Sequence, residues 1–256
     1  MSKTSVLSTL AEGPVRGSVP RFELRAWREE YGVVAGITGR GEGAQGFDLG
    51  LASEQPTRVV MDRWRDFKAA MNPFPAFVVG RQVHGTDVRW HSSGPGWTLV
   101  EGVDGHATAA AGLLLCVTAA DCVPIYLVDP VRRSVALLHS GWRGTAGRIV
   151  DQGLKLLADW CGSRAQDVVV HCGVGICGRC YEVGPDVRAA CGVGDSSKAG
   201  GLLDLRAVIM DQARKSGVEK VTASPYCSSH DADRFYSHRA SGGRDGRMVA
   251  YLGIAP

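Results

Sequence analysis

Hydrophobic residues along the chain are gathered in short runs separated by polar or Gly-rich turns, beginning near Tyr31. Runs of this length, bounded by turn residues, are typical of buried β-strands. The sequence therefore predicts strands within YGVVAGIT (31–38), PAFVVGRQVHG (75–85), GLLLCVT (112–118), IYLVD (125–129), RSVALLHSGWRG (133–144), DVVVHCGVG (167–175) and RMVAYLGI (247–254).

Three other segments have the spacing of amphipathic helices. Apolar residues recur at helical intervals, with charged residues between them, in 57–70, 145–160 and 202–216. Strands mixed with helices, without regular βαβ alternation, favour an α/β (α+β) layered sandwich with a mixed sheet and flanking helices. Residues 1–20 mix Ser, Thr, Gly and Pro without periodicity and are predicted to form a flexible N-terminal lead-in, which leaves 21–256 as a single domain.

Composition excludes several classes of protein. With 45% hydrophobic and 21% charged residues in 256, the chain can build a large core. It has no apolar run long enough for a membrane span or a signal peptide, so we expect a cytoplasmic protein without a membrane partner. The net charge of +3 is spread along the chain, which argues against nucleic acid as a partner. Eight cysteines without a secretion signal argue against a disulfide framework.

Three polar residues occur where apolar runs end: His84 in RQVHGTDV, Cys122 in AADCVP and His139 in LLHSGWRG. Zinc binds imidazole nitrogen and thiolate sulfur, and three protein ligands leave one position for water or substrate. The long spacings differ from the close ligand pairs of zinc fingers. The alternative is that each is an ordinary core or turn residue, since spacing alone does not bring them together. A rival interpretation takes Cys122 as a thiol nucleophile beside a histidine base.

A second candidate is the Cys177-Gly-Arg-Cys180 segment. A CxxC pair can be a redox couple or half of a metal site, but the chain has no second CxxC for a four-cysteine zinc site. We therefore expect both residues to be buried thiols without a catalytic role.

The third feature is FYSHRASGGRDGRMVAYLG, before the C-terminus. Arg239, Arg244 and Arg247 could bind an anion, and Phe235 or Tyr236 could stack on a base. The alternative is a hairpin-like turn with exposed arginines.

Five segments in this order resemble one known family: QVHGTDV, TAADCVPIYLVDP, HSGWRGTAGRIV, GICGRCYEVG and FYSHRASGGRDGRM. Over residues 24–255 the chain is similar to the YfiH-like laccase-domain (multicopper polyphenol oxidase-type) proteins, a family of purine nucleoside phosphorylases. The resemblance implies an α/β sandwich and a zinc ion held by His84, Cys122 and His139. It also implies phosphorolysis of adenosine, inosine, guanosine and methylthioadenosine, together with adenosine deamination.

The implied reactions suggest roles for further residues. Phosphorolysis needs groups that hold phosphate beneath the ribose, and the candidates are Arg40, Arg143 and Arg239. Asp121, beside Cys122, is a candidate for orienting the site or for acid–base catalysis. The chain departs from the family where Asp48 replaces the usual Asn of the first Gly-rich loop, GRGEGAQGFDLG (39–50), and in the residues before Cys180. The expected partners are a small-molecule nucleoside and phosphate, and the sequence leaves the oligomeric state open.

Members of the same family have been called copper laccases and peptidoglycan editing factors. Copper is the less favoured cofactor, because a multicopper oxidase needs several His-rich motifs and this chain has seven His in total. Two further functions stay open for this sequence. One is a cysteine-type hydrolase acting in cell-wall quality control, with Cys122 as nucleophile, and the second is a non-enzymatic partner in that process.

Overall fold

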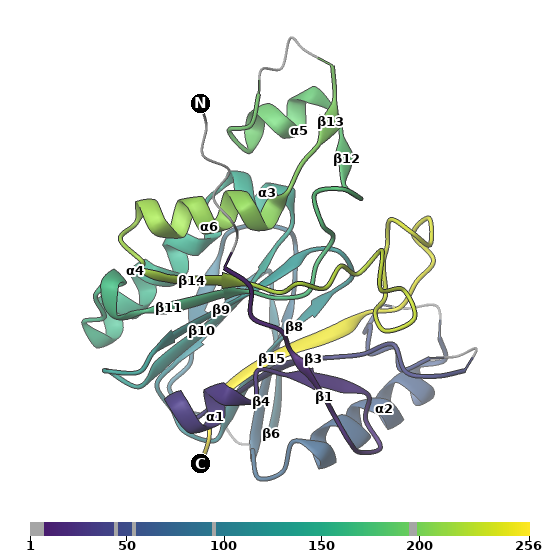
Figure 1. Ribbon diagram of the computed structural model, residues 1–256. Coiled ribbons are helices and arrows are strands. Elements are labelled where there is room, and N and C mark those ends of the chain that lie inside the picture. Colours follow the sequence, from purple (N-terminus) through teal and green to yellow (C-terminus); the bar gives the residue numbers. More distant parts are fainter. Residues whose placement is uncertain (1–7, 44–45, 53–54, 94–95, 195–198) are drawn as a thin grey trace.

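Two mixed β-sheets packed face to face form the centre of the protein (Figure 1). The computed structural model describes residues 8–43, 46–52, 55–93, 96–194 and 199–256. The first sheet has the order β1 (Gly13–Val15), β2 (Arg21–Glu23), β3 (Val33–Thr38), β15 (Met248–Ile254), β8 (Leu113–Ala119), β4 (Ala76–Arg81) and β6 (Gly96–Glu101). The second has the order β14 (Lys220–Ala223), β11 (Val169–Cys172), β9 (Val123–Asp129), β10 (Ser134–Ser140), β7 (Gly105–Thr108) and β5 (Val88–Trp90).

The central strands are apolar throughout because each of their faces packs in a different core. In β8, Leu115 and Val117 lie between the two sheets, whereas Leu114 and Cys116 face the helix α2 (Thr57–Ala70). Strand β10 alternates in the same way between the core that the sheets share and the core beneath the helices of the second sheet. Strands covered on both faces show continuous hydrophobic runs instead of alternation, as the sequence does.

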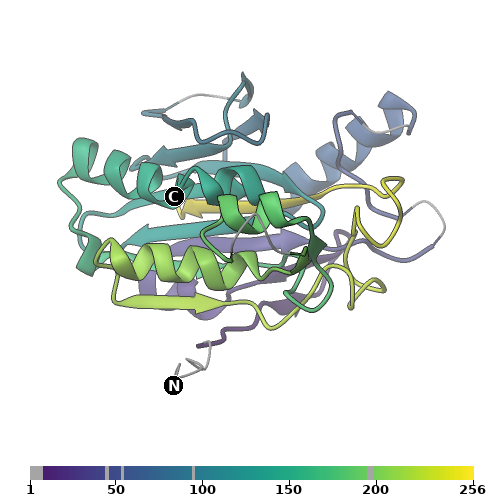
Figure 2. The ribbon, with the colours of Figure 1, turned by 90° about the horizontal axis from the view of Figure 1, so that it is seen from above.

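Helices cover both outer faces of the sandwich (Figure 2). Helix α2 packs on the first sheet, and α3 (Trp142–Ala146), α4 (Ile149–Cys161) and α6 (Leu205–Lys215) pack on the second. The remaining elements are α1 (Ala26–Tyr31), the 3-10 turn η1 (Ala165–Asp167), α5 (Pro185–Ala190) and the pair β12 (Glu182–Val183) and β13 (Gly201–Leu202). The predicted layered α/β sandwich is confirmed. Across the described ranges, no helix combines the length and hydropathy that crossing a bilayer requires.

The N-terminal segment is more ordered than its composition predicts. Residues 1–7 lie outside the described residues, but β1 pairs with β2, and Glu12 is fully buried. The Glu12 carboxylate accepts a hydrogen bond from Ser224 Oγ (2.7 Å) and lies 3.1 Å from His171 Nε2. The prediction of a flexible lead-in is therefore corrected from Ser8 onward, because partners remote in sequence hold this polar stretch.

Candidate functional site

His84, Cys122 and His139 lie together at one end of the sandwich, although they are far apart in the sequence. His84 follows β4, Cys122 lies in the turn between β8 and β9, and His139 is near the end of β10. We call these three residues the His2Cys cluster. Their ligand atoms all lie within 4.8 Å of one another, and the two imidazole rings meet edge to face at 4.9 Å between centroids. One sulfur and two nitrogens at this separation could hold a zinc ion and leave one coordination position open.

Asp104, which was not predicted from the sequence, holds two members of this cluster, His84 and His139, in place through hydrogen bonds. Its buried carboxylate lies 2.9 Å from Nδ1 of His139 and accepts backbone N–H groups of Val83, His84 and Gly85 at 3.1, 2.9 and 2.7 Å. A carboxylate on one ring nitrogen of a histidine leaves the other nitrogen for a metal. The aspartate in VDGHA carries no local signal of this role, because its partners lie in β10 and in the turn after β4.

The backbone around the cluster allows the three ligand side chains to approach one another closely. His84 has a φ of 60°, in the left-handed region, and the Asp104 carboxylate holds its N–H there. A Cβ at Gly141 would lie 3.0 Å from the Cys122 sulfur and 3.3 Å from the His84 ring. The glycine of HSGWRG therefore makes room for the ligand atoms, and a side chain in its place would push them apart.

The two histidines favour the thiolate form of Cys122. Burial works to raise the pKa of this thiol, but attraction to His139 and hydrogen bonds with both histidines outweigh burial and lower the pKa to about 6. Burial works to lower the pKa of His139, but Cys122 and Asp104 outweigh it and raise that pKa to about 9. The thiolate is the form of Cys122 that binds metals, and His139 would release its proton when it becomes a ligand.

The cluster opens into a cleft of about 1340 Å³ whose lining is rich in arginine. The arginines are Arg40, Arg81, Arg143, Arg239, Arg244 and Arg247, and the carboxylates in the same lining are Asp48, Asp121 and Asp245. This excess of positive groups favours an anionic ligand.

The three arginines expected to bind substrate or phosphate, Arg40, Arg143 and Arg239, all line this cleft. Each guanidinium group stacks over a different aromatic ring. The rings are those of Tyr236, Trp142 and Tyr181, with guanidinium carbons at 5.3, 4.4 and 5.0 Å from the respective centroids. Stacking restricts the guanidinium plane, so less side-chain freedom is lost when an anion binds.

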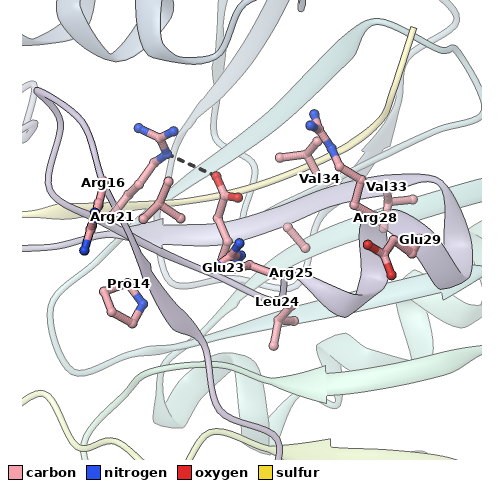
Figure 3. Close-up of a pocket in the computed structure, with 12 residues that line it drawn as sticks. Pro14, Arg16, Arg21, Glu23, Leu24, Arg25, Arg28, Glu29, Val33 and Val34 are labelled. Atoms are coloured by element: carbon pink, nitrogen blue, oxygen red, sulfur yellow. Dashed lines mark hydrogen bonds and ion pairs between the residues drawn. The ribbon is translucent and has the colours of Figure 1, made fainter.

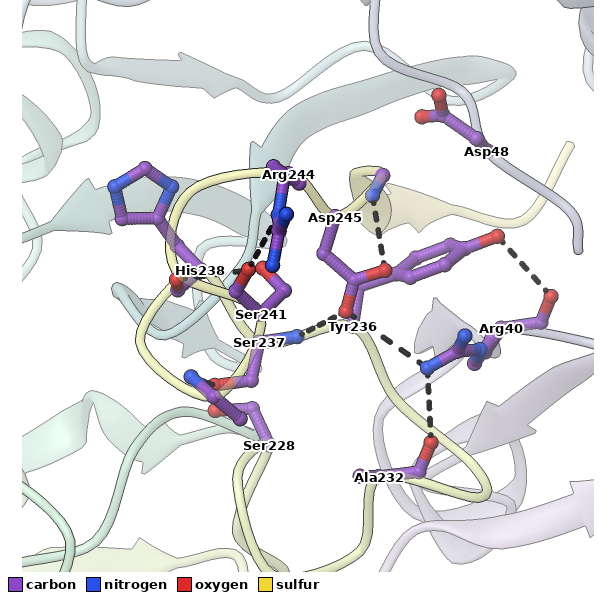
Figure 4. A network of polar contacts seen from close by, with 12 residues as sticks. Arg40, Asp48, Ser228, Ala232, Tyr236, Ser237, His238, Ser241, Arg244 and Asp245 are labelled. Atoms are coloured by element: carbon purple, nitrogen blue, oxygen red, sulfur yellow. Dashed lines mark hydrogen bonds and ion pairs between the residues drawn. The ribbon is translucent and has the colours of Figure 1, made fainter.

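Arg40 joins the first Gly-rich loop to the segment between β14 and β15 (Figure 4). Its Nη1 donates to the carbonyl of Ala232 at 3.3 Å and lies 3.8 Å from the Asp245 carboxylate. The backbone N–H of Ser237 donates to the same carboxylate at 3.0 Å, and the Tyr236 hydroxyl donates to the Arg40 carbonyl at 3.4 Å. These contacts bring chain segments separated by about two hundred residues into one wall of the cleft.

Asp48 and Asp121 both use their carboxylates to fix backbone. Oδ1 of Asp48 accepts the N–H groups of Gly50 and Arg247, each at 2.8 Å. The carboxylate of Asp121 accepts Ser228 Oγ and the N–H of Arg239, both at 2.6 Å. Asp48 therefore shapes the loop at this departure from the family pattern.

The two aromatic candidates for base stacking differ in position. Tyr236 lines the cleft, but Phe235 is fully buried in the core between the sheets, 4.9 Å from the ring of Phe22. The expectation that Phe235 could stack on a base is therefore wrong.

Cys177 and Cys180 are not simply buried thiols, which corrects the expectation from the sequence. Both are half-buried and lie beside two residues of the segment after β14. We call the group the Cys3His cluster, and its members are Cys177, Cys180, Cys227 and His230. Sequence analysis missed the second pair. In the sequence this pair is marked by the CxxH spacing in YCSSHD, which matches the spacing of the CxxC pair.

A second cavity, of about 780 Å³, lies beside β1, β2 and α1 (Figure 3). Charged residues of both signs line it, and Arg21 donates to Glu23 at 3.1 Å within it. It holds none of the predicted site residues, which line the cleft instead.

Known proteins resemble this chain over most of its length. The model of a family described as multi-copper polyphenol oxidoreductase laccase matches residues 34–255. A purine nucleoside phosphorylase of Deinococcus radiodurans is 36% identical over 215 residues, 82% of each chain. The purine nucleoside phosphorylase YlmD of Geobacillus stearothermophilus is 34% identical over 268 residues, 95% of each chain.

Solved structures show the same fold. The crystal structure of YlmD from Geobacillus stearothermophilus superposes with a TM-score of 0.85 at 29% identity, covering 96% of this chain and 100% of that one. The hypothetical protein YfiH of Bacillus licheniformis gives a TM-score of 0.83 at 24% identity, covering 91% and 96%.

Proposed function

Because this chain belongs to the laccase-like family described as multi-copper polyphenol oxidoreductase laccase, in which similar members are named purine nucleoside phosphorylase, we propose that it is a zinc-dependent enzyme of purine nucleosides. Its reactions are phosphorolysis of adenosine, inosine, guanosine and methylthioadenosine, and deamination of adenosine. The observation that carries the proposal is the His2Cys cluster in the wall of an arginine-rich cleft.

The donor set of the cluster fits zinc better than copper chemistry of the laccase type. A thiolate and two imidazoles suit zinc, and over the described residues the other metal-ligand group contains a single histidine, unlike the His-rich sites of multicopper oxidases. When bound, zinc supplies Lewis acidity, which activates water near neutral pH. Asp104 orients His139 toward that ion through Nδ1.

The arginines supply the second half of the proposal. Arg40, Arg143 and Arg239 hold phosphate next to the nucleoside, with their planes set by stacking on aromatic rings. Asp121 acts as a positioning residue, because both of its oxygens accept hydrogen bonds, one of them from the backbone of Arg239.

The test is an assay of purified, zinc-loaded protein with adenosine across a phosphate titration, products being separated by chromatography. Adenine marks phosphorolysis and inosine marks deamination. Arg40→Ala and Arg143→Ala should weaken apparent phosphate affinity by about 10- to 150-fold, from roughly 1.5–3 kcal/mol per charge-assisted contact. Deamination should persist, because it needs no phosphate.

Arg58→Ala is the matched control, since Arg58 is exposed on α2 and pairs only loosely, at 3.9 Å, with Asp62. Absence of both products from the wild-type protein would refute the proposed function. Equal loss of both activities in the arginine variants would instead mean that these residues orient the nucleoside.

One observation favours a second candidate function, a cysteine-type hydrolase. Cys122, His139 and Asp104 have the order of a nucleophile, a base and the group that orients the base, and the pKa of the Cys122 thiol is lowered to about 6. Such an enzyme should cleave peptide or cell-wall substrates when treated with chelator and lose that activity on addition of zinc. The zinc enzyme proposed above should instead lose activity with chelator and regain it when zinc is added.

A further inference from the structure

The Cys3His cluster joins two loops that are remote in the sequence. Cys177 and Cys180 follow β11, and Cys227 and His230 follow β14, the parallel neighbour of β11 in the second sheet. The pairing of these two strands delivers both loops to the same edge. All four ligand atoms lie within 4.8 Å of one another.

Two nitrogen–sulfur distances inside the cluster match the edges of a tetrahedral zinc site. Nδ1 of His230 lies 3.5 Å from Cys177 Sγ and 3.6 Å from Cys180 Sγ. With zinc–sulfur bonds of about 2.3 Å and zinc–nitrogen bonds of about 2.0–2.1 Å, a tetrahedron has nitrogen–sulfur edges of about 3.6 Å. The nitrogen is therefore already at ligand spacing from two sulfurs.

Each half of the cluster is a tight turn that presents two ligands. The N–H of Cys180 donates to the carbonyl of Cys177 at 3.0 Å, and the N–H of Asp231 donates to the carbonyl of Cys227 at 2.8 Å. The N–H of Cys177 donates to Cys227 Sγ at 3.2 Å, which ties one turn to the other. Two ligand pairs, each separated by two residues, are the arrangement of structural zinc sites.

We propose that the Cys3His cluster binds a second zinc ion, with a structural role. Three thiolates and one imidazole complete a tetrahedron, so this ion has no position for substrate. The residues that line the cleft include none of the four ligands, although Ile176 and Tyr181 beside them do line it. The zinc therefore lies behind the cleft wall.

The ion would secure a part of the cleft that carries functional side chains. Ser228 lies between the ligands of the second turn and donates to Asp121, whose other oxygen accepts the N–H of Arg239. Joining the two turns thus fixes the hydrogen bonds that place Arg239 beside the His2Cys cluster. The proposal is independent of the reaction, and its test needs no turnover.

The experiment counts zinc in the full chain by mass spectrometry, after zinc loading and gel filtration. We expect two zinc ions per wild-type chain, and one in His230→Ala and in Cys180→Ser. The matched control, Cys161→Ser at a half-buried cysteine outside both clusters, should keep two. One zinc per wild-type chain, with no loss in His230→Ala, would overturn the proposal.

A second measurement isolates the site and covers variants that fail to fold. In cobalt-loaded His84→Ala/His139→Ala protein, we expect the thiolate charge-transfer and tetrahedral bands of a Cys3His site. In wild-type protein, zinc should protect Cys177 and Cys180 from iodoacetamide, and chelation should expose them. Equal alkylation with and without zinc, or a Cys177–Cys180 disulfide in protein purified under reducing conditions, would refute the site.

Discussion

The two ligand clusters of this protein contain similar atoms, but they differ in the number of ligands and in their position relative to the cleft. The His2Cys cluster gathers three residues from three strand ends, faces a cleft and leaves a coordination position open. The Cys3His cluster gathers two local pairs, lies behind the cleft wall and supplies four ligands. An open site suits reaction chemistry and a closed one suits stability. The number of ligands, more than their identity, separates the two roles that we propose for these clusters.

The clusters also differ in the groups that form hydrogen bonds with their ligands. The His2Cys cluster has a buried carboxylate, Asp104, that orients His139 and collects three backbone N–H groups. In the Cys3His cluster the hydrogen bonds to the ligands come from the turns themselves. The carboxylate thus orients the ligands of the cluster for which we propose an open coordination position.

The largest expected effect separates the clusters by activity. His139→Ala should lower turnover of adenosine by about 100-fold or more, because a metal supplies several kcal/mol to such reactions. His230→Ala should leave turnover at saturating phosphate within a few-fold of wild type. Steady-state rates, with zinc content measured in parallel, check this contrast. Equal losses in two folded variants would mean that the division of roles is wrong.

Asp104→Asn should weaken zinc binding at the His2Cys cluster by about 10- to 100-fold, the usual cost of losing a carboxylate behind a metal-bound histidine. Competition with a chelating dye measures the affinity. Asp129→Asn is the matched control, since Asp129 is equally buried and accepts two backbone N–H groups, of Val131 and Arg132, away from either cluster. Unchanged affinity in Asp104→Asn would remove Asp104 from this role.

Stability should respond to the Cys3His cluster. His230→Ala should lower the Tm by about 4–8 °C, from a loss of about 2 kcal/mol at 2–4 °C per kcal/mol for a domain of this size. His84→Ala should lower the Tm by less than half as much, because His84 is an exposed ligand at the edge of the cleft. Calorimetry of zinc-loaded proteins measures both, and the reverse order would contradict the assignment of the structural ion.

The smallest expected effect is a shift in the pH dependence of one thiol. In chelator-treated protein, iodoacetamide should alkylate Cys122 with a midpoint near pH 6, because the histidines outweigh burial and lower its pKa to about 6. The reactive thiolate is present above that pH and is lost below it, whereas a free cysteine titrates near 8.5. His139→Ala should move the midpoint upward, as mass spectrometry of the labelled peptide would show. A midpoint near 8.5 in the wild-type protein would exclude the thiolate–imidazole pair.

The element pattern was accessible from the sequence, because burial on both faces leaves continuous apolar runs. The helix expected within 57–70 is α2, and the closing strand expected at 247–254 is β15. Short strands at the sheet margins were missed. In β5 and β6 the side chains are partly exposed, so neither strand produces an apolar run.

The candidate site was accessible only in part. The ends of apolar runs marked His84, Cys122 and His139, and the spacing of Cys177 and Cys180 marked a possible ligand pair. Nothing local marked Asp104, whose role arises from contacts with the turn after β4 and with β10.

The sequence by itself determined the long buried strands, the polar residues at their ends, and the family to which the chain belongs, because local patterns of residues carry this information. Only the tertiary structure decided which ends meet. The parallel pairing of β11 with β14 places the CxxC turn against the CxxH turn. The burial of Phe235 and the anchoring of Glu12 were decided in the same way. Sheet order depends on packing between elements remote in the chain, and that information lies in no single segment.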